Sequence, residues 1–339
     1  MERNFPQLGQ YQQFYYRPDS PRLVEKRSIM RTVSAVGITM LVYILLKRLM
    51  PRVVLVTMMS IGFPTKVQGN VLVGTELTQQ LAGVISTTIT LVFPALMLYF
   101  LLGTHSQLHK LFKKPAPRYA IASLPITAAV AIISAFGMEV LRSTLDRLGI
   151  QVFQVEEPYL ATTAGKFIYL LSLTLIPAVF EELFFRGVLM HSLRRHGDGF
   201  ALILSSTLFA LMHYNIYMVL NAFLMGLLIG YFVIRTGSII TGILMHLANN
   251  LLTVGLSELQ ASLDPSIGAI AVNLIYIILL LFGLLSVVYL VGQDASLFSL
   301  HERKSCFTTA TKVRYAAGNV FLLVVIIISV FDLLASFGT

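Results

Sequence analysis

Apolar runs of about 20 residues recur from Ser28 to Phe337, separated by short polar stretches. A run of this length, wound as an α-helix, matches the thickness of the hydrocarbon core of a bilayer. In lipid every backbone donor and acceptor of an open segment must be paired within that segment, and the alternating pattern of barrel strands is absent from the sequence. The sequence therefore predicts an all-α, polytopic membrane helical bundle.

We expect about eight or nine transmembrane helices around an intramembrane cavity, and the apolar stretch 53–63 is too short to span and should be re-entrant or interfacial. The segment 138–165 is expected to be the longest external loop, with a short surface helix in its first half. The candidate spans are 29–46, 83–103, 119–138, 166–190, 200–214, 216–234, 238–254, 268–291 and 315–337.

Composition supports a single membrane domain, because 56% of the 339 residues are hydrophobic and only 12% are charged, which exceeds what a soluble core requires. We expect a polar N-terminal tail at 1–27 and one transmembrane domain at 28–339. The tail lacks the apolar region and cleavage site of a signal peptide, so the first apolar run should stay attached as an anchor. Cys306 is the single cysteine, which excludes an internal disulfide and any multi-cysteine metal site.

The formal net charge of +9 comes from Lys and Arg residues that fall in short loops between the apolar runs. The positive-inside rule places such loops on the cytoplasmic side, so we expect 110–118, 194–195 and 303–314 to face the cytoplasm of a cell membrane, with a cytoplasmic N-terminus. Lys47, Arg48 and Arg52 are exceptions that would then lie on the opposite side. The charge indicates contact with membrane lipids, and no nucleic-acid partner is implied.

Glu181 and Glu182 form a pair of carboxylates in the middle of an apolar run. A charge inside a span costs about 2.5–3.5 kcal/mol on insertion scales, so the pair calls for an explanation. Glu182 and Arg186 at i and i+4 share one helix face, whereas Glu181 points about 100° away from Glu182. We expect Glu182 to pair with Arg186 and Glu181 to face the cavity. The alternative is a buried salt bridge that only holds helices in register.

Two further apolar helices carry polar side chains at helical spacing. Phe209 and His213 lie at i and i+4 in one of them, and His246 and Asn250 at i and i+4 in the other, with Asn249 slightly round the helix. Each site alone has a structural explanation, a core imidazole or a hydrogen bond between helices. Together with the glutamates they match a hydrolytic centre, in which a carboxylate and an imidazole activate water while another imidazole and an amide stabilise the oxyanion.

Other mechanisms are less well supported by the sequence. No serine lies in a nucleophile motif. Zinc held by Glu181, His213 and His246 is the main chemical rival, although no His-Glu-x-x-His motif occurs. Two non-enzymatic readings also stay open: a binding or bacteriocin-immunity protein that keeps the motif for structural reasons, and a transporter that uses these groups for proton relay.

The three sites resemble, in order, spacing and setting, the motifs of the CAAX protease and bacteriocin-processing family, which includes the type II CAAX prenyl endopeptidases. The resemblance is confined to about 165–255, which we take as the catalytic core, and rests on three motifs: Glu181-Glu182-x-x-x-Arg186, Phe209-x-x-x-His213 and His246-x-x-x-Asn250.

The resemblance implies a glutamate-dependent, metal-independent intramembrane peptidase without a cofactor. Glu181 and His213 would activate water, and His246 and Asn250 would form the oxyanion hole. The supporting residues would be Glu182, Arg186, Phe209 and Asn249. The substrate would be a membrane-associated or lipidated protein or peptide.

Overall fold

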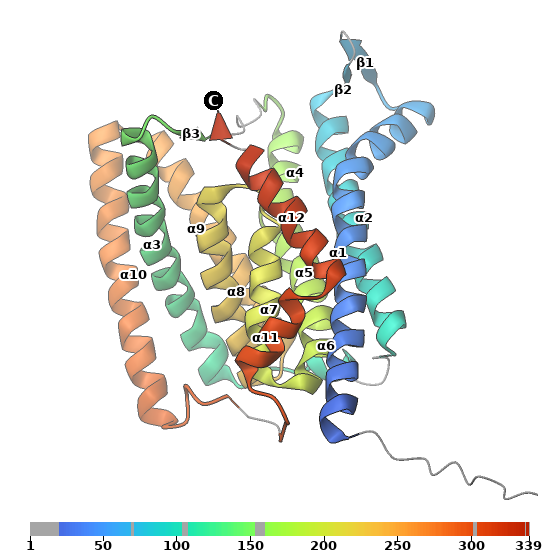
Figure 1. Cartoon of the computed structure of the whole chain (residues 1–339). Coiled ribbons are helices and arrows are strands. Elements are labelled where there is room, and N and C mark those ends of the chain that lie inside the picture. Colours follow the sequence, from blue (N-terminus) through green and yellow to red (C-terminus); the bar gives the residue numbers. More distant parts are fainter. Residues whose placement is uncertain are drawn as a thin grey trace, which may run out of the picture.

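The computed structural model describes residues 20–68, 71–103, 108–152, 160–300, 304–335 and 337–338. These residues form a polytopic helical bundle, which confirms the predicted fold class (Figure 1). The α-helices are α1 Pro21–Ser60, α2 Glu76–Leu102, α3 Pro117–Arg147, α4 Thr163–Leu173, α5 Leu175–Glu182, α6 His191–Leu193, α7 Asp198–Leu211, α8 Ile216–Thr236, α9 Ile239–Ser262, α10 Pro265–Gln293, α11 Thr309–Ala317 and α12 Val320–Ala335.

Short helical turns and four short strands complete the described fold. A 3-10 helix covers Leu108–Phe112, a π-helix Leu183–Met190 and a second 3-10 turn Arg194–His196. β1 Thr65–Gln68 pairs antiparallel with β2 Val71–Gly74, and β3 Gln151–Val152 pairs with β4 Phe337–Gly338. Both pairs lie at the end of the bundle opposite the start of α1 (Figure 1).

Among the described residues, seven helices are long and apolar enough to cross a membrane, or eight if the bent pair α11 and α12 is one span. The expected span 200–214 is instead α7, an apolar helix of 14 residues. At 1.5 Å per residue it extends about 21 Å, which is short of the hydrocarbon thickness. The expected span 315–337 is broken by a 74° bend between α11 and α12.

Helix α1 differs most from the sequence expectation. It continues through Pro51 for 40 residues, so 53–60 are the end of a long helix and do not form a separate re-entrant segment. An interfacial position of this stretch stays a prediction. The physical reason is packing, because Val54 and Met58 form a small buried cluster with Ala82 of α2. Of the expected tail 1–27, residues 1–19 lie outside the described residues, and α1 already begins at Pro21.

The segment 138–165 also differs from its prediction. Its first part is the continuation of α3, which runs without a break to Arg147, so no separate surface helix forms there. Residues 153–159 of this segment lie outside the described residues.

The expected helix 166–190 is divided in a way that positions the glutamates. α4 ends at Leu173 and α5 begins at Leu175, with Pro177 in its first turn, where a missing N–H is tolerated. The π-helix then starts directly after Glu182. π-Helical segments are rare and occur often at functional sites, because they shift the faces that side chains occupy.

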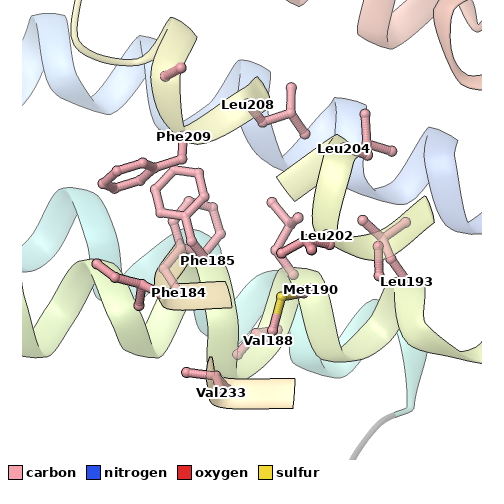
Figure 2. Packing of buried hydrophobic residues seen from close by; sticks show 14 of the residues in the cluster. Phe184, Phe185, Val188, Met190, Leu193, Leu202, Leu204, Leu208, Phe209 and Val233 are labelled. Atoms are coloured by element: carbon pink, nitrogen blue, oxygen red, sulfur yellow. The ribbon is translucent and has the colours of Figure 1, made fainter. Parts of the chain in front are cut away.

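An aromatic cluster packs behind this segment. Figure 2 shows Phe184, Phe185 and Phe209 gathered between α7 and the π-helix, and all three side chains are buried. The ring centroids of Phe185 and Phe209 lie 5.1 Å apart in an edge-on arrangement. The cluster fixes α7 against the helix that carries the two glutamates.

Candidate active site

Glu182 and Arg186 form a buried ion pair, as the i, i+4 spacing predicts. Arg186 Nη1 donates to Glu182 Oε1 at 2.6 Å, and the two side chains are 1% and 0% exposed. The guanidinium also donates to the carbonyl of Gly226 at 3.4 Å and lies 4.4 Å from the centroid of the Phe209 ring. A buried charged side chain is tolerated when it is paired and hydrogen-bonded, and these contacts supply partners for both members of the pair.

His246 contacts the same carboxylate. Its Nδ1 lies 2.8 Å from Glu182 Oε1, while its Nε2 lies 3.9 Å from Oε2 of Glu181. Because Oε1 of Glu182 is also the acceptor for Arg186, we assign the proton of this hydrogen bond to Nδ1, and Nε2 is the nitrogen directed toward Glu181. Glu182 is therefore shared between an arginine on its own helix and a histidine on α9.

The close approach of α9 depends on Gly242, one turn before His246. A Cβ atom at this position would lie 2.7 Å from Cγ2 of Val233 and 3.0 Å from Oε2 of Glu182. Real side chains do not make contacts that short with packed atoms. The glycine therefore lets α9 lie against both α8 and the carboxylate.

His213 lies in the turn that follows α7. Its Nδ1 is 2.9 Å from the carbonyl oxygen of Phe209, which can only accept, so Nδ1 carries the proton and Nε2 of the neutral ring has a free lone pair. The Phe209 ring packs edge-on against both histidines, with centroid distances of 4.9 Å to His213 and 6.0 Å to His246. Phe209 thus sets the separation of the two imidazoles.

Asn249 and Asn250 lie one turn beyond His246 on α9. Asn249 Nδ2 donates to Oδ1 of Asn250 at 3.2 Å, and Asn250 Nδ2 donates to the carbonyl of Thr174 at 3.4 Å. Thr174 is the residue between α4 and α5, so the helix break supplies this acceptor. The hydrogen bond is long and therefore weak, which leaves the Asn250 amide available to a better acceptor.

The two glutamates differ in exposure as expected. The Glu181 side chain is 20% exposed and that of Glu182 is 0% exposed. Glu181 also lies within electrostatic range of His213 and Lys47. An accessible carboxylate beside two imidazoles can take a proton from water, while the buried carboxylate can only orient its neighbours.

Lys47 is a member of this neighbourhood that sequence reasoning missed. Its Nζ donates to the carbonyl of Met212 at 2.7 Å, next to His213, and lies 4.3 Å from the centroid of the Tyr214 ring. The expected first span ends at residue 46, so Lys47 falls just beyond it and was not expected at the site. The signal that could have found it is its i, i+4 relation to Tyr43, whose ring centroid is 6.0 Å from Nζ.

Ion pairs and ring contacts thus link six of the eight predicted site residues, and the other two lie on the same helix as His246. The connected set is Glu181, Glu182, Arg186, Phe209, His213 and His246. Asn249 and Asn250 form a pair on the same helix as His246. An intramembrane cavity next to Glu181 stays a prediction.

The zinc alternative can be tested on the donor atoms. Within the described ranges, no three His, Cys, Asp or Glu side chains are grouped so that they could hold a metal ion. The hydrogen bonds engage Nδ1 of both His213 and His246, and each ring keeps Nε2, the one nitrogen that a metal ligand needs. These contacts are therefore compatible with either scheme, and the absence of a metal stays a prediction.

Comparison with known proteins gives one result. Residues 163–252 match the family model described as "Type II CAAX prenyl endopeptidase Rce1-like". No curated protein and no solved structure matches the chain. The matched segment includes every predicted site residue, from Glu181 to Asn250. The match supports the general function of a CAAX intramembrane protease. The resemblance inferred from the three motifs is therefore confirmed for this segment: it is similar to the Rce1-like type II CAAX prenyl endopeptidases.

Proposed function

We propose that this protein is an intramembrane endopeptidase that hydrolyses a peptide bond of a membrane-associated or lipidated protein or peptide, using a water molecule activated by Glu181 and His213. The observation that supports it most is the arrangement around His246, whose Nδ1 is held by Glu182 at 2.8 Å while Nε2 faces Glu181 at 3.9 Å. Two carboxylates with different exposure and two oriented imidazoles in a lipid-embedded bundle have no simple structural purpose.

The reaction begins with water beside Glu181 and His213. Glu181 accepts a proton from the water as its oxygen attacks the carbonyl carbon, and Nε2 of His213, with its free lone pair, orients the same water. The carbonyl oxygen gains the negative charge of the tetrahedral intermediate. When the intermediate collapses, the C–N bond breaks, and the proton taken up by Glu181 passes to the leaving amine. Atoms and charge balance without a covalent enzyme intermediate.

The oxyanion is stabilised by His246 and Asn250 in this scheme. Since Nδ1 of His246 donates to Glu182, the donor to the oxyanion would be Nε2, which needs a ring that carries a proton on both nitrogens. Asn250 would exchange its 3.4 Å hydrogen bond with Thr174 for the stronger, charge-assisted bond to the oxyanion. Removal of a single oxyanion donor typically lowers kcat by about 10²–10³.

The decisive experiment replaces the proposed base, Glu181, by glutamine, which has nearly the same shape but no carboxylate. Purified Glu181→Gln protein in liposomes should lose cleavage by at least about 10³ in kcat, while its melting temperature stays close to that of the unaltered protein. Glu258→Gln is the matched control, because Glu258 is an exposed carboxylate further along α9. Full turnover by Glu181→Gln would remove this residue from the catalytic role.

The substrate is identified separately, by profiling cleavage of peptide libraries with and without a lipidated cysteine. Cleavage that requires the lipid would define a CAAX-type substrate for this chain. The alternative of a binding or immunity protein is tested by complementation: protection of cells by Glu181→Ala and His213→Ala variants would favour scaffolding over catalysis.

A further inference from the structure

A second polar site lies at the end of the bundle where α1 begins and α2 ends (Figure 1). The structure has a cavity of about 330 Å³ there, lined by Arg27 and Arg31 of α1, Arg195 of the 3-10 turn and Leu101 and Leu102 of α2. Cavities of this size hold small ligands and lipid headgroups.

The cavity carries concentrated positive charge. Arg27 and Arg31 lie at i and i+4, so they share one face of α1, and Arg31 is close enough to Arg195 for their charges to repel. No carboxylate is among the described residues that line the cavity. Arg194, the neighbour of Arg195 in the chain, does not line the cavity and pairs with Asp198 through hydrogen bonds of 2.8 Å and 3.2 Å.

The positions of these arginines are fixed by a buried hydrogen bond. Thr32 Oγ1 lies 3.0 Å from Nε2 of His196 and 3.0 Å from the carbonyl oxygen of Ser28. His196 is adjacent to Arg195, so this contact ties α1 to the turn that carries the third arginine. Arg195 is oriented further by donating from Nε to the carbonyl of Ser192 at 3.1 Å. Like charges are thus held together by the fold, a situation that an anion would relieve.

The apolar side of the cavity indicates where the anion comes from. Leu101 is 48% exposed and forms part of the apolar outer surface of α2 beside the cavity. A phosphodiester with an attached acyl chain would place its charge on the arginines and its chain along the leucines. Basic pockets between transmembrane helices at a membrane surface bind anionic headgroups in this way.

We propose that this cavity binds the phosphate of an anionic phospholipid. The site is separate from the proposed peptidase centre, because Arg31 and Lys47 are about 24 Å apart along α1 at 1.5 Å per residue. The assignment therefore does not depend on the proposed function, and lipid binding can be measured on an inactive variant.

The test uses the full chain and two charge-neutral double variants. Arg31→Gln with Arg195→Gln removes the charges of the cavity, and Arg22→Gln with Arg118→Gln removes two exposed charges that do not line it. Binding of phosphatidylglycerol is compared with that of phosphatidylcholine by native mass spectrometry in detergent, and the thermal shift is recorded with each lipid and with inorganic phosphate.

We expect the unaltered chain to bind phosphatidylglycerol in preference to phosphatidylcholine, the cavity variant to lose at least tenfold in affinity, and the control variant to keep it. The melting temperature of both variants without added lipid shows whether they fold. Equal binding by the cavity variant and the control would overturn the proposal. A thermal shift with inorganic phosphate but not with phosphatidylglycerol would also overturn it, in favour of a soluble anion.

Discussion

Nδ1 of His246 lies 2.8 Å from Oε1 of Glu182, the oxygen that also accepts from Arg186 at 2.6 Å. One buried carboxylate oxygen therefore joins α5 and α9 and sets the orientation of the imidazole toward Glu181. A hydrogen-bonded carboxylate fixes the tautomer and ring orientation of a histidine, and effects of residues that act as a unit are not additive. Glu182 is thus a positioning residue for His246 in addition to the partner of Arg186.

This relationship predicts strong coupling between the two residues. We expect Glu182→Gln and His246→Gln each to lower kcat by about 10²-fold or more, and the double variant to be little worse than the poorer single variant. The measurement is a double-mutant cycle on kcat with a fluorogenic peptide. Multiplicative effects of the two changes would show that they act independently.

Gly242→Ala should open the contact between α9 and Glu182. The added Cβ meets Val233 and the carboxylate at 2.7 Å and 3.0 Å, and overpacking of this kind costs about 1–3 kcal/mol. We expect a lower melting temperature and loss of most cleavage. Gly255→Ala on the same helix is the control, because nothing lies within 4 Å of its Cβ position, and there alanine should be neutral or stabilising. Equal behaviour of the two variants would argue against the close contact.

Lys47→Met should lower kcat more than it raises KM, because the ammonium group supports the turn that carries His213 through the Met212 carbonyl at 2.7 Å and contributes positive charge near Glu181. We expect a loss of about 10- to 100-fold, with partial rescue by Lys47→Arg. Arg48→Gln serves as the neighbouring control, since Arg48 pairs with Asp332 on α12 at 2.7 Å. An active Lys47→Met protein would exclude this role.

The hydrogen bonds of Asp294 lead us to expect a pH-dependent contribution to the stability of the protein. Hydrogen bonds from Tyr119 at 2.6 Å, then from Ser296 and Arg235, hold the pKa of this carboxyl well below its usual value. A lowered folded-state pKa contributes stability above the unfolded pKa of about 3.9, and that contribution is lost as the pH falls toward the folded value.

The melting temperature of Asp294→Asn should accordingly lie below that of the unaltered protein by a constant amount between about pH 5 and pH 7, and the difference should shrink below about pH 4. Asp146→Asn, at an exposed position of α3, is the control and should show no such change. A difference that stays the same down to pH 3 would contradict the assignment.

Metal content distinguishes the water-activation scheme from the zinc alternative. We expect active protein to contain far less than one zinc per chain by elemental analysis and to keep its activity after prolonged chelation. One tightly held zinc per chain, together with loss of activity on chelation and recovery on zinc addition, would replace the proposed scheme with metal-assisted hydrolysis.

Local spacing was sufficient to predict part of the site. The ion pair of Glu182 and Arg186 follows from their separation by one helical turn, and the shared face of His246 and Asn250 follows in the same way. The contact between Glu182 and His246 could not be predicted, because it depends on how α9 packs against α5 and on the absence of a side chain at Gly242.

Helix ends were predicted less well, for identifiable reasons. The predicted first span ends at residue 46, but α1 runs on to Ser60, and Val54 and Met58 of its last part pack on α2. Lys47 lies on this longer helix, so the wrong helix end and the missed lysine are related. The π-helix after Glu182 leaves no composition signal, because its side chains are as apolar as those of an ordinary span.

The short length of α7 has a consequence for how the bundle tolerates change. The chain turns between the end of α7 at Leu211 and the start of α8 at Ile216, so peptide groups that a continuous helix would pair internally need other partners. Side chains provide these partners. Lys47 Nζ donates to the carbonyl of Met212, and the side-chain oxygen of Asn215 accepts from the backbone N–H of Tyr217 at 2.9 Å. His213 lies in this turn, so the polar groups that satisfy the turn also determine where its ring points.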